Sequence, residues 1–187
     1  MKYIFDFDDV IFDSIRFKQE KLFPALVHKG VTAQQVQEVY KKGFTSPENL
    51  FKDVALACGV QLSTQEQGDI VENLFTNLNS FLHADTVELI KQKGKSDCVI
   101  LSLGDTLFQK RKISETGLDE LVSHVKIVQD SKKDWVIDFS NTYTAETVYF
   151  IDNTEGHLNH PEFSLLPNLK TVLYVGPESL REVMTFS

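Results

Sequence analysis

The chain has 187 residues, of which 42% are hydrophobic and 25% are charged. This composition excludes a disordered chain, and the length suits one α/β domain of ordinary size with a small insertion. The formal net charge of −8 disfavours sequence-independent binding to nucleic acid, which needs an excess of lysine and arginine. Small phosphorylated ligands remain compatible with this charge if a cation neutralises them locally.

The cysteines and the apolar segments predict the cellular compartment of the protein. Cys58 and Cys98 both lie in apolar stretches, so we expect small core residues in a reducing compartment instead of a disulfide. No apolar stretch reaches the length of a membrane span, and the first residues predict a strand in place of a basic and then apolar leader. The sequence therefore predicts a cytoplasmic protein without a membrane partner.

The first fourteen residues combine a buried strand with acidic side chains. Residues 3–5, Tyr-Ile-Phe, are typical of a strand in a parallel sheet that helices cover on both faces. Asp6, Asp8, Asp9 and Asp13 follow. Two carboxylates about 5 Å apart repel by roughly 3 kcal/mol at an effective dielectric near 20, so such a cluster must spread into water, bind a proton or hold a cation. Because ligand sites of open α/β sheets form at the carboxyl ends of strands, a cation is favoured.

Residues 15–83 contain no convincing buried strand. Apolar side chains recur there at helical spacing, and glycines interrupt the pattern. Ser46 followed by Pro47 is typical of a helix start. Residues 63–66, Ser-Thr-Gln-Glu, have the form of a capping box that opens a long helix to residue 82. This segment is therefore predicted to be entirely helical.

Strands and helices alternate after residue 83. Short, buried runs predict strands at 97–102, 124–128, 147–151 and 171–175. Helical patterns predict helices at 84–93, 106–116 and 131–143. Strands separated by helices indicate right-handed crossovers and a parallel sheet. The predicted fold class is α/β, a doubly wound, five-stranded parallel sheet with an inserted all-helical segment.

A family resemblance rests on the acidic segment. Residues 6–10, Asp-Phe-Asp-Asp-Val, resemble the first motif of the haloacid dehalogenase-like hydrolases, DxDx(T/V), and residues 11–14 resemble its continuation in phosphatase-like members. The family inserts a small helical cap after this motif. The resemblance therefore implies a Rossmann-like core domain of residues 1–14 and 84–187 and a cap domain of residues 15–83.

The resemblance implies the roles of two aspartates. In the family the first aspartate of the motif is the nucleophile and the second is the general acid and base, which places these roles on Asp6 and Asp8. A carboxylate attacks phosphorus to give an aspartyl-phosphate, and a second acid protonates the leaving oxygen before it activates water. The presence of Asp8 favours phosphoryl transfer, because members without the second acid include the dehalogenases. The alternative interpretation of Asp8 is that it only caps a helix or a turn. Asp9 stands where the family usually has glycine.

Phosphate-binding residues follow from two further motifs. Ser102 ends the second core strand, where the family has a hydroxyl that can donate to a phosphoryl oxygen. A structural role for this serine is the alternative. The family's lysine precedes the fourth strand and offsets the charge of nucleophile and phosphate. Lys132 fits the expected spacing better than Lys133, which remains an alternative, and ordinary solvated lysines are the other interpretation.

The fourth motif implies a metal ligand. Asp152, after the fourth strand, matches its first acidic position, and Asn153 stands where many members have a second aspartate. The resemblance implies Mg²⁺ bound by Asp6, Asp152 and the carbonyl of Asp8, with Asn153 as a possible further ligand; Mg²⁺ prefers oxygen ligands and keeps several waters. His157 is interpreted as a surface residue.

Topology explains why these positions could meet. If the first strand is central, Asp6 and Asp152 flank the point where the strand order reverses and a crevice opens. The implied activity is that of a magnesium-dependent phosphatase that hydrolyses a small phosphate monoester through an aspartyl-phosphate. A phosphomutase uses the same residues and stays open, as does a catalytically weakened member that binds a phosphorylated ligand or partner, which Asn153 and Asp9 suggest. The expected partner is a small phosphorylated metabolite, and neither its identity nor the oligomeric state is readable from the sequence.

Overall fold

The computed structural model describes residues 1–27, 30–41 and 46–184. The chain divides into two compact units, a core unit of Met1–Asp13 with Leu82–Ser187 and a helical unit of Ser14–Phe81. These boundaries lie one and two residues from the expected ones. An inserted helical unit between the first strand and the rest of the core is the arrangement that the change of periodicity in the sequence indicated.

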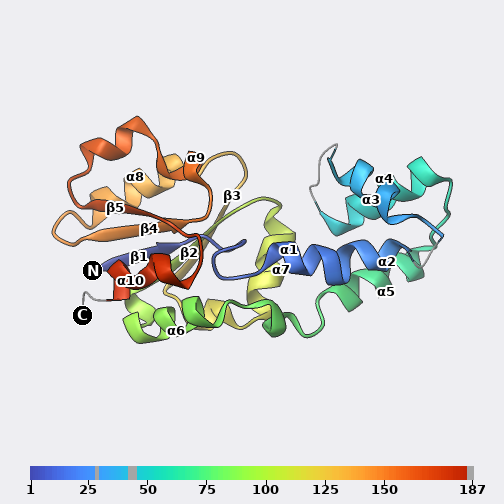
Figure 1. Ribbon diagram of the computed structural model, residues 1–187, viewed down its shortest axis with the longest axis horizontal. Coiled ribbons are helices and arrows are strands. Elements are labelled where there is room, and N and C mark those ends of the chain that lie inside the picture. The colour runs from blue at the N-terminus through green and yellow to red at the C-terminus, as the bar shows by residue number, and fades with distance from the viewer. Residues whose placement is uncertain (28–29, 42–45, 185–187) are drawn as a thin grey trace. The chain divides into compact units, whose positions relative to one another are not determined.

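The core unit is built on one parallel sheet with the strand order β3-β2-β1-β4-β5 (Figure 1). The strands are β1 (Lys2–Phe5), β2 (Cys98–Leu103), β3 (His124–Val128), β4 (Val148–Asp152) and β5 (Leu169–Leu173). The predicted fold class is confirmed, and the first strand has the central position that the predicted site requires. The fifth strand begins two residues earlier than predicted, because Leu169 already pairs with Val148.

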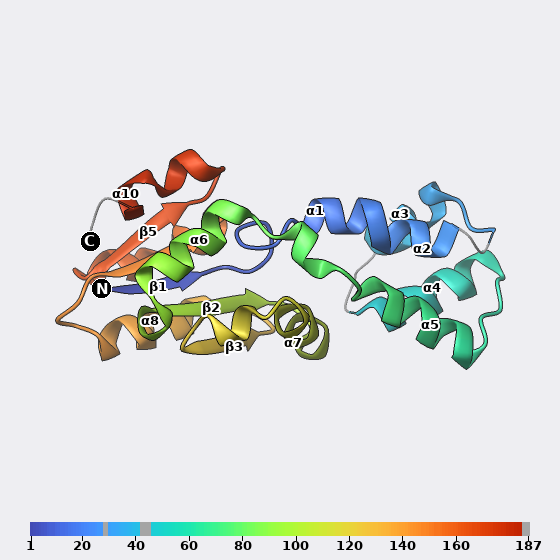
Figure 2. The same cartoon turned by 90° about the horizontal axis from the view of Figure 1, so that it is seen from below.

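Helices cover both faces of this sheet. They are α6 (Ala84–Lys93), α7 (Thr106–Glu115), α8 (Lys133–Thr142), α9 (Glu155–Leu158) and α10 (Arg181–Met184), with short 3-10 turns at Lys95–Asp97, Leu118–Glu120, Pro161–Leu165 and Pro177–Leu180. Figures 1 and 2 show α8 on one face and α6 on the other. Parallel strands that are covered on both faces read as continuous apolar runs, as β1 and β4 do.

A hydrophobic cluster joins α8 to the centre of the sheet. Ile4, Leu101 and Phe150 from three neighbouring strands are fully buried against Val136 of α8. Burial of such a side chain contributes about 1.5–3 kcal/mol relative to its exposure. The first turn of α8 is therefore fixed against the strands, and with it the position of the residue before the helix, Lys132.

The helical unit consists of short helices. They are α1 (Ser14–Phe17), a π-helical turn at Lys18–Leu22, α2 (Phe23–Val27), α3 (Ala33–Lys41), α4 (Pro47–Cys58), α5 (Thr64–Leu74) and a 3-10 turn at Leu78–Phe81. Ser46 caps α4, and Ser63 with Glu66 forms the predicted capping box of α5. The predicted helix from residue 63 to 82 is wrong in length, because it ends at Leu74 and Asn77 adopts a left-handed conformation with φ 54°.

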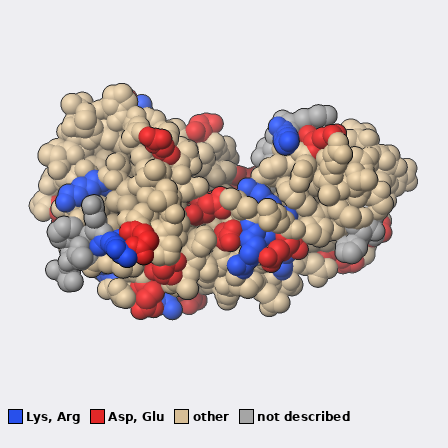
Figure 3. Space-filling model, in the orientation of Figure 1, with Lys and Arg blue, Asp and Glu red and all other residues tan. Residues whose placement is uncertain are grey.

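In the view of Figure 3, lysine and arginine side chains of the core unit are interspersed with aspartate and glutamate. Within the part of the chain that the structure describes, every helix is too short or too polar to cross a membrane.

Candidate active site

The site begins where β1 ends. The amide of Asp6 still donates to Ile151 O at 2.9 Å, which continues the pairing with β4. The chain then turns sharply, because the amides of Ile11 and Phe12 both donate to Phe7 O. Asp9 lies at φ 59°, a left-handed conformation that aspartate tolerates better than most residues. This conformation gives a physical reason why a related chain would have glycine at this position.

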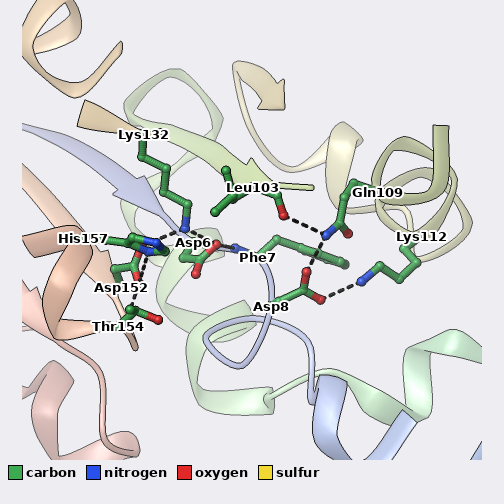
Figure 4. A network of polar contacts seen from close by, with 10 residues as sticks. All are labelled: Asp6, Phe7, Asp8, Leu103, Gln109, Lys112, Lys132, Asp152, Thr154 and His157. Atoms are coloured by element: carbon green, nitrogen blue, oxygen red, sulfur yellow. Dashed lines mark hydrogen bonds and ion pairs between the residues drawn. The ribbon is translucent and has the colours of Figure 1, made fainter. Parts of the chain in front are cut away.

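A buried ammonium joins the two distant aspartates. Lys132 Nζ lies 2.6 Å from Asp6 Oδ1 and 2.7 Å from Asp152 Oδ2. All three side chains are buried, and they come from the ends of β1 and β4 and from the start of α8 (Figure 4). The structure thus brings together the acids predicted to meet at the carboxyl edge of the sheet. Lys132 lies directly between them.

Asp152 is surrounded by donors. Its Oδ1 accepts a hydrogen bond from the amide of Thr154 at 2.8 Å, and Nδ1 of His157 lies 3.2 Å and 3.1 Å from Oδ1 and Oδ2. Since a carboxylate only accepts, this contact requires the His157 proton on Nδ1. His157 is partly exposed, as a surface residue would be, but it also contacts Asp152, which the sequence did not predict. The start of α9 turns its ring toward the fourth strand.

Burial and charge act on Asp6 in opposite directions. The pKa of Asp6 is raised to about 7, because the increase caused by burial and by the Asp152 carboxylate outweighs the decrease caused by the Lys132 ammonium. One lysine cannot neutralise two carboxylates. Added positive charge would therefore stabilise the ionised form of Asp6.

The cluster has a place for such a charge. No described residue donates a hydrogen bond to Oδ2 of Asp6, whereas Oδ1 already accepts from the Phe7 amide at 2.7 Å. One ligand atom each of Asp6, Asp152 and His157 lies within 4.8 Å of the others. Carboxylate oxygens are hard ligands that suit Mg²⁺. The residues present therefore fit a divalent cation between Asp6, Asp152 and His157.

Asp8 belongs to a second polar group. Its Oδ1 accepts from Lys112 Nζ at 2.6 Å and its Oδ2 from Gln109 Nε2 at 2.5 Å. Gln109 and Lys112 are buried residues of α7. Figure 4 shows Asp6 directed toward Lys132 and Asp8 directed toward α7.

The other predicted site residues occupy different environments. Ser102, the fifth residue of β2, is fully buried, and its Oγ has no hydrogen-bond partner among the described residues. Lys133 is partly exposed and forms an ion pair with Glu162 at 2.9 Å, so it does not contact the aspartates. Asn153 follows Asp152 directly and is partly exposed.

Sequence reasoning missed His157, Gln109 and Lys112 as members of the site. Lys112 could have been recognised as a buried lysine, because it lies four positions after Phe108 on the inward face of a predicted helix. A lysine at an inward position needs a carboxylate partner. The partner itself could not be found from the helix, because Asp8 is 104 residues away in the sequence.

Comparisons with known proteins agree on the fold. Neither family models nor curated proteins match the sequence. A haloacid dehalogenase-like hydrolase from Burkholderia xenovorans superposes with a TM-score of 0.72 at 18% identity, over 98% of this chain and 87% of that one. The L-2-haloacid dehalogenase from Xanthobacter autotrophicus gives 0.59 at 13% identity, over 100% and 83%. A Bacillus subtilis HAD-type hydrolase bound to magnesium gives 0.53 at 15% identity, over 92% and 85%.

These similarities extend over nearly the whole chain, the helical unit included. The chain has a five-stranded parallel sheet with a helical unit inserted after the first strand. The chain therefore has the fold of the haloacid dehalogenase-like hydrolases.

Proposed function

We propose that the protein is a hydrolase of small phosphate monoesters that uses Asp6 as nucleophile and requires Mg²⁺. The observation that carries the proposal is the buried Asp6–Lys132–Asp152 cluster at the point where the strand order reverses. Ligands of open α/β sheets bind in the crevice at this point. An anionic substrate needs positive charge there, and Lys132 supplies part of it.

The roles of the residues follow from charge and position. Asp6 is the nucleophile, because its Oδ2 is free to attack phosphorus while Lys132 and the Phe7 amide hold Oδ1. Asp152 and His157 hold Lys132 and the loop after β4 in place. Asp8 is the acid and base, and Ser102 offers a hydroxyl that has no hydrogen-bond partner in the part of the chain that the structure describes.

Mg²⁺ would be held by Asp6, Asp152 and the carbonyl of Asp8, and would screen the phosphate from the surrounding carboxylates. Asp152 already accepts hydrogen bonds on both oxygens, so one of these contacts would be exchanged on binding. The water-accessible Asn153 is the nearest additional oxygen donor along the chain. A small phosphorylated metabolite is the proposed substrate class.

The experiment is hydrolysis of 4-nitrophenyl phosphate with and without Mg²⁺. Asp6→Asn should abolish turnover while circular dichroism stays unchanged. Lys132→Met should lower kcat/KM at least 100-fold, in the range that a preorganised charge contributes. Lys133→Met is the matched control and should change kcat/KM less than 2-fold, because Lys133 contacts Glu162 instead. Turnover that survives in Asp6→Asn would refute the nucleophile.

Dehalogenation is the competing activity, since one structure with the same fold is an L-2-haloacid dehalogenase. Asp8 argues against it, because removal of a halide needs no acid to protonate the leaving group. Release of chloride from 2-chloropropionate, measured beside the phosphatase assay, separates the two activities. Chloride release without phosphate release would replace the phosphatase proposal.

A further inference from the structure

Two residues of α7 hold the side chain of Asp8 by both of its oxygens. Lys112 and Gln109 are three positions apart, so they lie on one face of the helix. Lys112 Nζ contacts Oδ1 at 2.6 Å, and Gln109 Nε2 contacts Oδ2 at 2.5 Å. A carboxylate with a donor on each oxygen has a fixed rotamer, whereas a single contact would let it rotate.

The orientation of the Gln109 amide is determined by its neighbours. Its nitrogen lies against two acceptors, Asp8 Oδ2 at 2.5 Å and Leu103 O at 3.2 Å. A flipped amide would place its oxygen against both of them, so only the nitrogen fits. Gln109 thus connects Asp8 to the end of β2. The amide oxygen is buried and has no hydrogen-bond partner among the described residues. The two hydrogen bonds that the amide nitrogen donates offset the free-energy cost of burying this oxygen.

Gly104 leaves room for this amide. A Cβ at this position would lie 3.1 Å from Gln109 Nε2, and the backbone there has φ 140°. Both facts favour glycine, since a side chain would push the amide away from Asp8.

Lys112 is held with equal precision. Its side chain is 3% exposed, and its ammonium lies 4.8–5.1 Å from the ring centres of Phe7, Phe12 and Phe108. Aromatic faces attract a cation and limit its lateral movement. A buried ammonium is expensive without a counter-ion, and Asp8 is a counter-ion of this one.

We infer that Lys112 and Gln109 are positioning residues that aim Asp8 as the base of the second half-reaction. The inference rests on the proposed phosphatase function. In that step a water oxygen attacks the phosphorus of phospho-Asp6 and the water proton passes to an Asp8 oxygen. The bond between phosphorus and the Asp6 oxygen breaks, and its electron pair returns to Asp6. Inorganic phosphate leaves, and Asp8 then gives the proton to solvent.

The first half-reaction can be separated from the second by the choice of substrate. Nitrophenolate leaves without a proton, so formation of phospho-Asp6 from 4-nitrophenyl phosphate needs no help from Asp8. A loss of positioning should therefore slow only the loss of phosphate from Asp6. When this step becomes limiting, kcat and KM fall together and kcat/KM stays constant.

The test compares Lys112→Met with Lys110→Met in steady-state and rapid-quench assays. Met keeps most of the volume of lysine within the aromatic surroundings, and Lys110 is an exposed residue of the same helix. Lys112→Met should lower kcat about 10- to 100-fold, a share of the 10²–10⁴ that a positioned base contributes. Its kcat/KM should stay within about 3-fold, and intact-mass spectrometry of quenched enzyme should show phosphate on Asp6. Lys110→Met should behave as the parent protein.

Gln109→Met provides a second variant that keeps the volume and removes the donor. It should give the same accumulation of phosphoenzyme, and it decides the question if Lys112→Met fails to fold. A parallel fall of kcat and kcat/KM without accumulated phosphoenzyme would overturn the inference, as would unchanged kinetics in both variants. A parent protein that hydrolyses no phosphate ester would instead refute the proposed function, and the inference with it.

Discussion

At the scale of single residues, Asp6 links the stability of the fold to pH. Its folded-state pKa of about 7 lies above the ordinary value of 3.8, chiefly because it is buried. Between these two values the folded state binds more protons at this group than the unfolded state does. The contribution of Asp6 to the free energy of unfolding therefore falls as pH rises from about 4 to about 7.

This linkage predicts a difference between the parent protein and Asp6→Asn without divalent cations. When pH rises through this window, the free energy of unfolding of the parent protein should fall by a few kcal/mol more than that of the variant. The reason is that a shift of one pKa unit corresponds to about 1.36 kcal/mol. Denaturant titrations in EDTA at several pH values, followed through the single tryptophan, Trp135 in the core unit, measure the difference. Identical pH dependence of the two proteins would show that burial does not perturb Asp6.

The residues of the site differ in how far sequence could predict them. Lys132 and Lys133 are adjacent and chemically equal, so only their spacing in the sequence favoured Lys132. The packing of α8 against the sheet explains why Lys132 is the lysine that reaches the aspartates. Those contacts agree with its predicted role, which still depends on the kinetic tests. Sequence could not assign three further residues to the site, Lys112, Gln109 and His157. Their partners depend on which helix lies beside which strand in the folded chain.

At the scale of elements, the capping box of α5 is a local device that sequence could predict in full. Ser63 accepts a hydrogen bond from the amide of Glu66, and Glu66 accepts one from the amide of Ser63. Ser63→Ala should reduce the stability of α5 by about 1 kcal/mol, because such caps contribute about 0.5–2 kcal/mol. Hydrogen exchange of the α5 amides measures this loss.

Thr64→Ala is the control for this substitution, since exposed Thr64 is the first helical residue and caps nothing. Alanine is the better helix former, so protection in this variant should stay equal or rise. Equal protection in Ser63→Ala and Thr64→Ala would mean that the box contributes nothing.

The ends of elements were harder to predict than their type. Apolar spacing extended the α5 pattern to residue 82, but the helix ends at Leu74 and resumes as a 3-10 turn at Leu78. Asn77, with its left-handed φ, lies between the two parts. Asparagine tolerates this conformation, so a break was permitted by the sequence without being specified by it.

At the scale of the whole chain, alternation of strands and helices was enough to predict the parallel sheet, whereas the central position of the first strand was a condition that the observed strand order meets. Right-handed crossovers leave few topologies for five such strands. This explains how acids 146 positions apart in the sequence come to share one lysine. The net charge of −8 has a local counterpart in the site, where two carboxylates face one ammonium within hydrogen-bond distance.

This excess of negative charge leads to a prediction about Mg²⁺ and thermal stability. A ligand that binds only the folded state adds about 2.7 kcal/mol to the free energy of unfolding when its concentration is 100 times its Kd. For a chain of this length that corresponds to a rise of roughly 5–10 °C in Tm, followed through Trp135. Asp6→Asn should lose most of the rise, because it removes a ligand charge, whereas Asp119→Asn, at an exposed acid outside the site, should keep it. An equal rise in both variants would place the bound ion elsewhere on the surface, and the proposed magnesium site would then be wrong.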